Sequence, residues 1–151
     1  MTTHHAAQIK SAGEPLEIVD VETRPPGSDE VRIAVSACGI CGTDTEEYLT
    51  GPHWIPVEHP NALTHAQAPI TLGHEFCGEV VAVGSEVHGL RVGDRVAPDT
   101  LLYCGHCYWC QRHQVQLCEH LAILGLMADG GLAEFCVAPE AMCLPLPPSL
   151  S

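Results

Sequence analysis

Basic residues are scarce in this 151-residue sequence. Six lysines and arginines stand against nineteen aspartates and glutamates, which gives a formal net charge of −13 at pH 7. Nucleic acids and anionic membrane surfaces are bound by clustered basic side chains that neutralise phosphate. Aromatic residues, on which bases could stack, make up only 5% of the chain. The composition therefore argues against nucleic acid and membranes as the main partners.

Long hydrophobic runs are also missing. The longest nearly apolar stretch covers only residues 121–128, whereas a membrane-spanning helix needs about 20 apolar residues. The first ten residues, MTTHHAAQIK, contain no apolar signal core. We expect His4 and His5 to be disordered because they lie so near a terminus. The predicted location of the protein is cytoplasmic.

The glycine-rich turn of dinucleotide-binding folds is absent as well. That turn has the pattern G-x-G-x-x-G after a strand and cradles a pyrophosphate. Among the fourteen glycines, no two are separated by a single residue. The sequence therefore predicts no cofactor-binding residues for a dinucleotide in this chain.

The sequence does contain enough apolar residues, 46%, for one domain with a core. Alternating apolar residues predict half-buried strands within residues 6–37, with Leu16, Ile18 and Val21 on the inner face of one of them. Further short strands are indicated by GEVVAVGSEV, LRVGDRVAP and LAEFCVAP, each bounded by glycine or proline. Many short strands favour a small barrel or sandwich. Residues 43–49 predict a short helix, and residues 51–70, with four prolines, an ordered loop.

Cysteines are abundant. The chain has nine, an odd number, together with ten histidines, and without a secretory signal this counts against a disulfide framework. Four thiolates on one short segment can enclose Zn²⁺ tetrahedrally with no open position, as in a structural site. An iron–sulfur cluster is the alternative, although the gap of seven residues departs from ferredoxin spacing. The segment has the spacing C-x2-C-x2-C-x7-C and consists of Cys104, Cys107, Cys110 and Cys118.

A second group of potential ligands comes from two distant motifs, CGICGTD and GHEFCGEVVAVGSEV. Cys41 and His74 would give one soft and one borderline ligand, a combination that suits zinc. Three protein ligands and an open fourth position would make such a site catalytic. Asp44 is suited to accept a hydrogen bond from the far nitrogen of His74. Taken alone, CGIC also fits a redox pair or a chance spacing.

These motifs together resemble a known family. GHEFCGEVVAVGSEV fits the zinc alcohol dehydrogenase signature G-H-E-x2-G-x5-G-x2-V without a gap. CGICGTD, GLRVGDRVAP, the four-cysteine segment and GGLAEFCVAP occur in the order that the family has. Over almost its whole length the chain resembles the amino-terminal, GroES-like catalytic domain of the zinc-dependent medium-chain dehydrogenases. The proline-rich segment is most similar to that of the 2,3-butanediol and polyol dehydrogenase branch.

The resemblance implies a mainly β fold, namely a GroES-like, partly open β-barrel with short helices, in one domain over residues 1–151. Within it we expect a proline-rich loop at 51–70, a structural zinc lobe at 103–120 and the start of a linker at 145–151. That linker would lead to a Rossmann cofactor domain that is absent from this chain. NAD or NADP would therefore bind only in the complete enzyme, which is expected to be a homo-oligomer acting on a small alcohol, diol or polyol.

The resemblance also implies roles for single residues. Cys41 and His74 match the catalytic zinc ligands, and Glu75 matches the adjacent carboxylate that can approach or join the metal. Thr43 matches the hydroxyl that takes the substrate proton, and Asp44 matches the carboxylate behind His74. The remaining protein ligand comes later in the family, at or beyond the domain junction. The structural zinc ligands would be Cys104, Cys107, Cys110 and Cys118, and the thiols expected only to pack are Cys38, Cys77, Cys136 and Cys143.

Two hypotheses about function follow. In the first, the chain is the catalytic-domain portion of a dehydrogenase in which zinc polarises the oxygen of a secondary alcohol or vicinal diol and a hydride passes to or from NAD(P). Alone, the 151 residues would then be inactive or nearly so. In the second, the chain is a truncated, non-enzymatic zinc-binding module that retains only the structural zinc.

One departure from the family pattern bears on the dehydrogenase hypothesis. Many relatives have histidine at the position of Glu46, so this carboxylate either relays the proton differently or merely faces water.

Overall fold

The largest unit in a computed structural model of the chain, which describes residues 2–11 and 14–150, is a five-stranded antiparallel sheet. The longest strand, β3 (Glu30–Cys38), pairs with a neighbour on each side, in a register that matches Ile33 with Val80 and with Cys136. The sheet has the order β10 (Cys143–Pro145), β6 (Arg95–Pro98), β5 (Phe76–Val83), β3 (Glu30–Cys38) and β9 (Phe135–Pro139).

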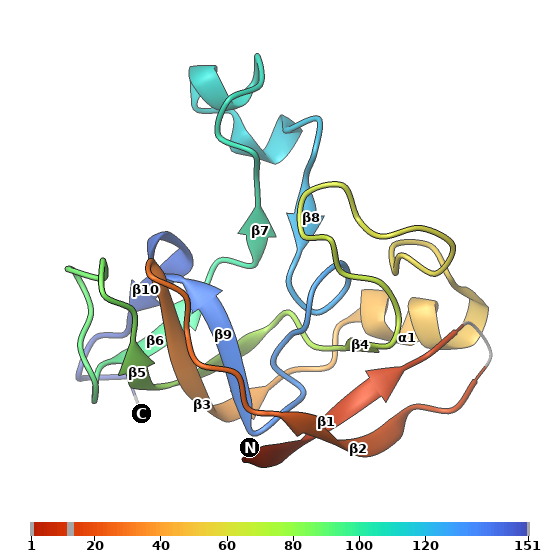
Figure 1. The fold of residues 1–151 in the computed structure, drawn as a ribbon, viewed down its shortest axis with the longest axis horizontal. Coiled ribbons are helices and arrows are strands. Elements are labelled where there is room, and N and C mark those ends of the chain that lie inside the picture. Colours follow the sequence, from red (N-terminus) through yellow and green to blue (C-terminus); the bar gives the residue numbers. More distant parts are fainter. Residues whose placement is uncertain (1, 12–13, 151) are drawn as a thin grey trace.

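Two smaller antiparallel sheets complete the β structure (Figure 1). One has the order β2 (Glu17–Glu22), β1 (Thr3–Ile9) and β4 (Ile70–Thr71). The other pairs β7 (Leu101–Leu102) with β8 (Ala122–Ile123) and forms the stem from which residues 103–121 project away from the rest of the molecule. The helical elements are α1 (Gly42–Thr50) and the short 3₁₀ helices η1 (Cys110–Arg112), η2 (Val115–Leu117) and η3 (Glu140–Met142).

Two apolar clusters form the core. The larger one lies on the five-stranded sheet and includes Val31, Ile33, Val80 and Val96, all completely buried. The second cluster lies between the proline-rich loop and β1 and β4, and it consists of Ile9, Ile55, Ile70, Leu72 and Leu126. The loop is thus anchored by apolar packing although it has no regular backbone pattern.

The main architectural predictions are confirmed. The fold is mainly β, a helix covers Gly42–Thr50, and residues 51–69 form a loop. Pro145 belongs to β10, and the amide of Leu146 donates to the carbonyl of Arg95, so the predicted linker begins inside the sheet. Ser151 lies outside the described residues. No helix in the described ranges is long and apolar enough to cross a membrane.

Two predictions about the first strands are wrong. Ile18 is 69% exposed, because β2 is an edge strand whose inward-facing residues are the half-buried Val19 and Val21. These valines pair with Ala6 and His4, whose side chains are buried, and opposite residues of an antiparallel pair share a face. His4 is therefore ordered within β1; its Nδ1 lies 2.9 Å from Thr23 Oγ1, and its ring meets the Phe135 ring edge-on.

Candidate metal centres

The first candidate ligand, Cys41, lies at the N-cap position of α1. The backbone N–H of Cys41 donates to Asp44 Oδ2 at 2.9 Å, and the Cys41 side chain in turn faces the backbone N–H of Asp44. Asp44 therefore fixes the start of the helix. Thr43 Oγ1 is 3.8 Å from Cys41 Sγ, so the hydroxyl lies beside the thiol.

The second ligand, His74, faces the other oxygen of the same carboxylate. His74 Nδ1 lies 3.5 Å from Asp44 Oδ1, and Asp44 is only 3% exposed. Neither atom has a hydrogen-bond partner among the described residues, and both are buried. A small rotation of the imidazole would form the bond and leave Nε2 free for a metal, as a metal-bound histidine requires.

Glycines allow the His74 segment to approach the end of β3 and the turn after residue 130. Gly73 has φ +96°, and a Cβ atom there would lie 2.7 Å from both Cys38 Sγ and the Leu132 amide nitrogen. A Cβ atom on Gly39 would lie 3.0 Å from Glu75 Oε2. Gly73 therefore has no room for a larger residue without a backbone shift, whereas at Gly39 a slight movement of the Glu75 side chain would make room.

Ligand atoms of Cys41, His74 and Glu75 all lie within 4.8 Å of one another. One thiolate, one imidazole and one carboxylate around a common point match the donor set of a three-ligand zinc site. Glu75 is exposed, whereas Cys41 and His74 are half-buried. These residues fit a metal that keeps a position open to solvent. The structure thus brings together the predicted residues of both distant motifs.

The four-cysteine lobe forms a separate cluster. The Sγ atom of Cys107 lies 3.5 Å from that of Cys110 and 3.9 Å from that of Cys118, which is 3.6 Å from the Sγ of Cys104. A tetrahedral zinc with Zn–S bonds of about 2.3 Å has sulfur–sulfur edges of about 3.8 Å. The observed separations therefore fit a closed four-thiolate site.

Backbone amides around the lobe donate hydrogen bonds to its sulfur atoms. The amides of Cys104 and His120 donate to Cys118 Sγ at 3.4 and 3.3 Å. Hydrogen bonds from backbone N–H groups, that of Cys110 first, lower the pKa of the Cys107 thiol to about 6. Gly105 has φ +77° and allows the tight turn after the first ligand. Burial and the neighbouring Cys107 thiol raise the pKa of Cys110 to about 12, so without a metal the lobe favours the charged form at Cys107 and the neutral form at Cys110.

The remaining cysteines lie in strands of the five-stranded sheet. Cys136 and Cys143 are 4% and 6% exposed, and burial raises the pKa of their thiols to about 12 and about 11. Cys38 and Cys77 are half-buried, and burial also raises the pKa of Cys38. The raised pKa values make Cys38, Cys136 and Cys143 poor nucleophiles near neutral pH.

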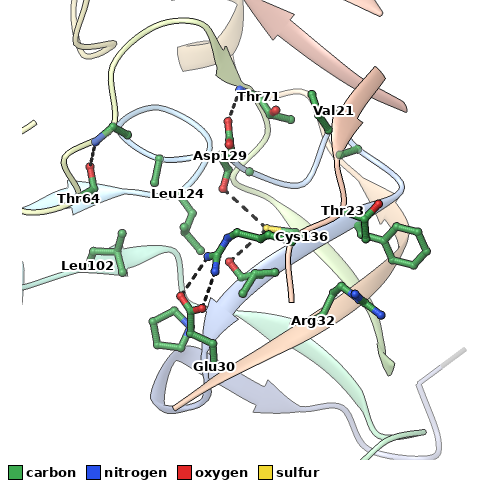
Figure 2. Close-up of a pocket in the computed structure, with 18 of the residues that line it drawn as sticks. Val21, Thr23, Glu30, Arg32, Thr64, Thr71, Leu102, Leu124, Asp129 and Cys136 are labelled. Carbon is green, nitrogen blue, oxygen red and sulfur yellow. Dashed lines mark hydrogen bonds and ion pairs between the residues drawn. The ribbon is translucent and has the colours of Figure 1, made fainter. Parts of the chain in front are cut away.

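A cavity of about 450 Å³ lies elsewhere (Figure 2). Arg24 binds Glu30 in it through two hydrogen bonds of 2.7 and 3.1 Å, and this pair lowers the pKa of Glu30. The amide of Thr71 donates to Asp129. None of the residues of the Cys41–His74–Glu75 cluster lines this cavity, and no sequence motif predicted the cavity.

Sequence reasoning also missed Glu47, one turn beyond Asp44 on α1. It is 1% exposed, although a glutamate in a short helix is ordinarily solvated. The signal that could have predicted its burial was its position three residues after Asp44, since residues three and four apart share a helix face.

Comparison with known proteins places the chain in a family. A family model described as "Alcohol dehydrogenase GroES-like domain" matches residues 27–148. The chain therefore belongs to the alcohol dehydrogenase GroES-like domain family, as the motifs predicted.

Individual relatives agree with this assignment. The chain is 41% identical over 138 residues to (R,R)-butanediol dehydrogenase of Bacillus subtilis (strain 168), covering 90% of this chain and 38% of that protein. The crystal structure of 2R,3R-butanediol dehydrogenase from Bacillus subtilis superimposes with a TM-score of 0.90 at 39% identity, over 98% of this chain and 42% of that one. The chain thus spans about two fifths of the length of these relatives.

Other solved structures are similar and hold ligands. An alcohol dehydrogenase from Escherichia coli CFT073, complexed with the cofactor NADH, has a TM-score of 0.83 at 34% identity, over 100% of this chain and 40% of that one. A cobalt- and zinc-bound thermostable alcohol dehydrogenase from Pyrobaculum aerophilum has a TM-score of 0.82 at 31% identity, over 99% and 43%. Both confirm the GroES-like, mainly β fold.

Proposed function

We propose that residues 1–151 are the catalytic-domain portion of a zinc-dependent dehydrogenase that oxidises a secondary alcohol or vicinal diol, or carries out the reverse reduction. The observation that carries this proposal is the convergence of Cys41, His74 and Glu75 within 4.8 Å, with the buried Asp44 carboxylate facing His74. This arrangement is that of a metal site with an oriented imidazole and an open position.

Zinc bound there would act as a Lewis acid and would lower the pKa of the substrate hydroxyl toward neutrality. The chain's own residues would do the rest. Asp44 would hold the Nδ1 proton of His74 and keep Nε2 directed at the metal. Thr43, whose Oγ1 lies 3.8 Å from Cys41 Sγ, would accept the hydroxyl proton of a substrate. Glu46, three residues after Thr43 on α1, is exposed to solvent. Its exposure supports the interpretation that it merely faces water.

The lobe would have a structural role. Its four thiols surround a common point and leave no position for a substrate. Zinc there would stabilise residues 103–120, whose backbone projects away from the rest of the chain (Figure 1).

The hydride carrier would bind outside these residues. Since the chain has no G-x-G-x-x-G turn and the similar E. coli structure is complexed with NADH, we place NAD or NADP in a cofactor domain of a longer enzyme. Residues 146–150 would lead toward that domain. The similarity to butanediol dehydrogenase supports a small alcohol, diol or polyol as substrate.

Metal analysis tests the proposal against the alternative of a zinc-binding module without catalytic zinc. We expect about two zinc ions per chain, falling to about one in Cys41→Ser and in His74→Ala. Cys104→Ser should remove the other zinc and leave the first. A single zinc that neither Cys41→Ser nor His74→Ala removes would establish the module instead.

A further inference from the structure

Glu47 accepts every backbone hydrogen bond donated by the turn that leaves α1. Its carbonyl oxygen accepts from the amide of Gly51 at 3.1 Å. Its Oε1 accepts from the amides of His53 and Trp54 at 2.9 and 2.6 Å. Pro52, the remaining residue of the turn, has no N–H to donate. A single glutamate therefore fixes the direction in which the chain enters the proline-rich loop.

The contact between Glu47 and the turn at residues 51–54, called the clamp below, is closely packed. Glu47 is 1% exposed, and its Oε2 is buried with no hydrogen-bond partner among the described residues. A Cβ atom on Gly51 would lie 2.5 Å from the Glu47 carbonyl oxygen and 2.9 Å from Oε2. Only glycine fits at this position. A carboxylate is costly to bury unless it makes such bonds, and the two amides of the turn supply them to Glu47.

The clamped turn connects the two parts of the proposed metal site. Cys41 begins the helix to which Glu47 belongs, and His74 follows β4 at the far end of the loop. Immediately after the turn, Ile55 enters the apolar cluster that also contains Ile70 and Leu72. Leu72 is 2% exposed and lies two residues before His74. The path from one ligand to the other thus runs through Glu47, Ile55 and Leu72.

We infer that Glu47 is a positioning residue for the proposed catalytic metal. By holding the loop against α1, it fixes the distance between Cys41 and His74 without touching the metal. This inference rests on the proposed function, because it requires a metal at these residues. The loss of Glu47 would leave two amides of the turn unpaired, release the Ile55 anchor and widen the range of positions that His74 occupies relative to Cys41.

Cobalt binding provides the test, with Co²⁺ as the probe. The lobe is first loaded with Zn²⁺, and the chain is then titrated with Co²⁺ while the visible absorption of the thiolate–cobalt site is recorded. We expect Glu47→Ala to weaken Co²⁺ binding about tenfold, the lower end of the effect of residues that orient metal ligands. Glu47→Gln keeps an oxygen acceptor for both amides and should stay within about threefold of the wild type. Glu58→Ala, an exposed glutamate of the same loop, is the matched control and should have no effect.

The outcomes separate this inference from the proposed function. If Glu47→Ala keeps its zinc-loaded lobe and its circular dichroism spectrum but binds Co²⁺ as the wild type does, the positioning role is wrong while the metal site stands. If the wild-type chain binds no Co²⁺, or binds it equally well after Cys41→Ser, both are overturned. Should Glu47→Ala fail to fold, Gly51→Ala tests the same clamp, and unchanged Co²⁺ affinity in the folded Gly51→Ala chain would reject it.

Discussion

The two candidate metal centres differ in how far apart their ligands lie in the sequence. The lobe takes all four thiols from residues 104–118, on a projection beyond the short β7–β8 stem. The other centre joins Cys41, before α1, to His74, after β4, and the whole proline-rich loop lies between them. A local site depends on turn geometry alone, whereas a dispersed site depends on tertiary packing. The two centres should therefore respond to different perturbations.

The largest effect should come from breaking the lobe. Cys110→Ser removes one of four thiolates, and because a structural zinc contributes its binding energy directly to local folding, residues 103–120 should lose their order. Hydrogen exchange measured by mass spectrometry should become fast across this segment and stay slow in β3 and β5. Persistent protection of the segment in the metal-free variant would show that packing, and not zinc, holds it.

The next effect concerns the dispersed centre. Asp44→Asn replaces the carboxylate that faces His74 and accepts from the Cys41 amide, and metal affinity at this centre should fall by about 10- to 100-fold. Isothermal titration of the lobe-loaded chain with Zn²⁺ measures this change. Asp20→Asn is the matched control, since Asp20 is 69% exposed. Equal affinity in both variants would contradict the orienting role of Asp44.

Thiol chemistry sharpens the contrast between the lobe and the core. In the metal-free chain, the rate at which iodoacetamide alkylates Cys107 should rise as the pH increases through about 6, where its thiol ionises. Below that pH the group is protonated and slow. Cys136, whose pKa is raised to about 12 by burial, should not react in the folded protein. Peptide mapping after a short pulse of iodoacetamide measures the alkylation of each cysteine. Zinc should protect Cys107. Faster alkylation of Cys136 than of Cys107 would refute the assignment of Cys107 to the metal lobe and of Cys136 to the core.

The smallest effect is expected for a packing thiol. Cys136→Ala removes one buried sulfur next to β3 and should lower the free energy of unfolding by about 1 kcal/mol, with no change in metal content. Chemical denaturation and metal analysis of the same sample provide both readings. A lost zinc ion would mean that Cys136 has a ligand role.

The lobe and the helix could be predicted from the sequence because their information is local. Ligand spacing alone identified Cys104 to Cys118, and a short polar segment identified α1. The metal role of Cys41 and His74 came from the family resemblance, because no local rule relates motifs so far apart. The inward face of β2 could not be predicted, since it depends on pairing with β1, where the buried His4 and Ala6 determine which residues face inward. The burial of Glu47 likewise arises only when the loop folds back onto α1.

The pairing of β7 with β8 has a consequence for engineering. Leu102 and Ala122 are direct partners across the stem, so the points at which the chain leaves and re-enters the body are neighbours in space. A two-residue hairpin turn could join them without altering the register of any other strand. Conversely, a foreign domain whose termini lie side by side could be inserted at the same place. The stem is thus a natural junction at which a sensor or binding module could be exchanged while strands β4 and β5, between which His74 lies, stay intact.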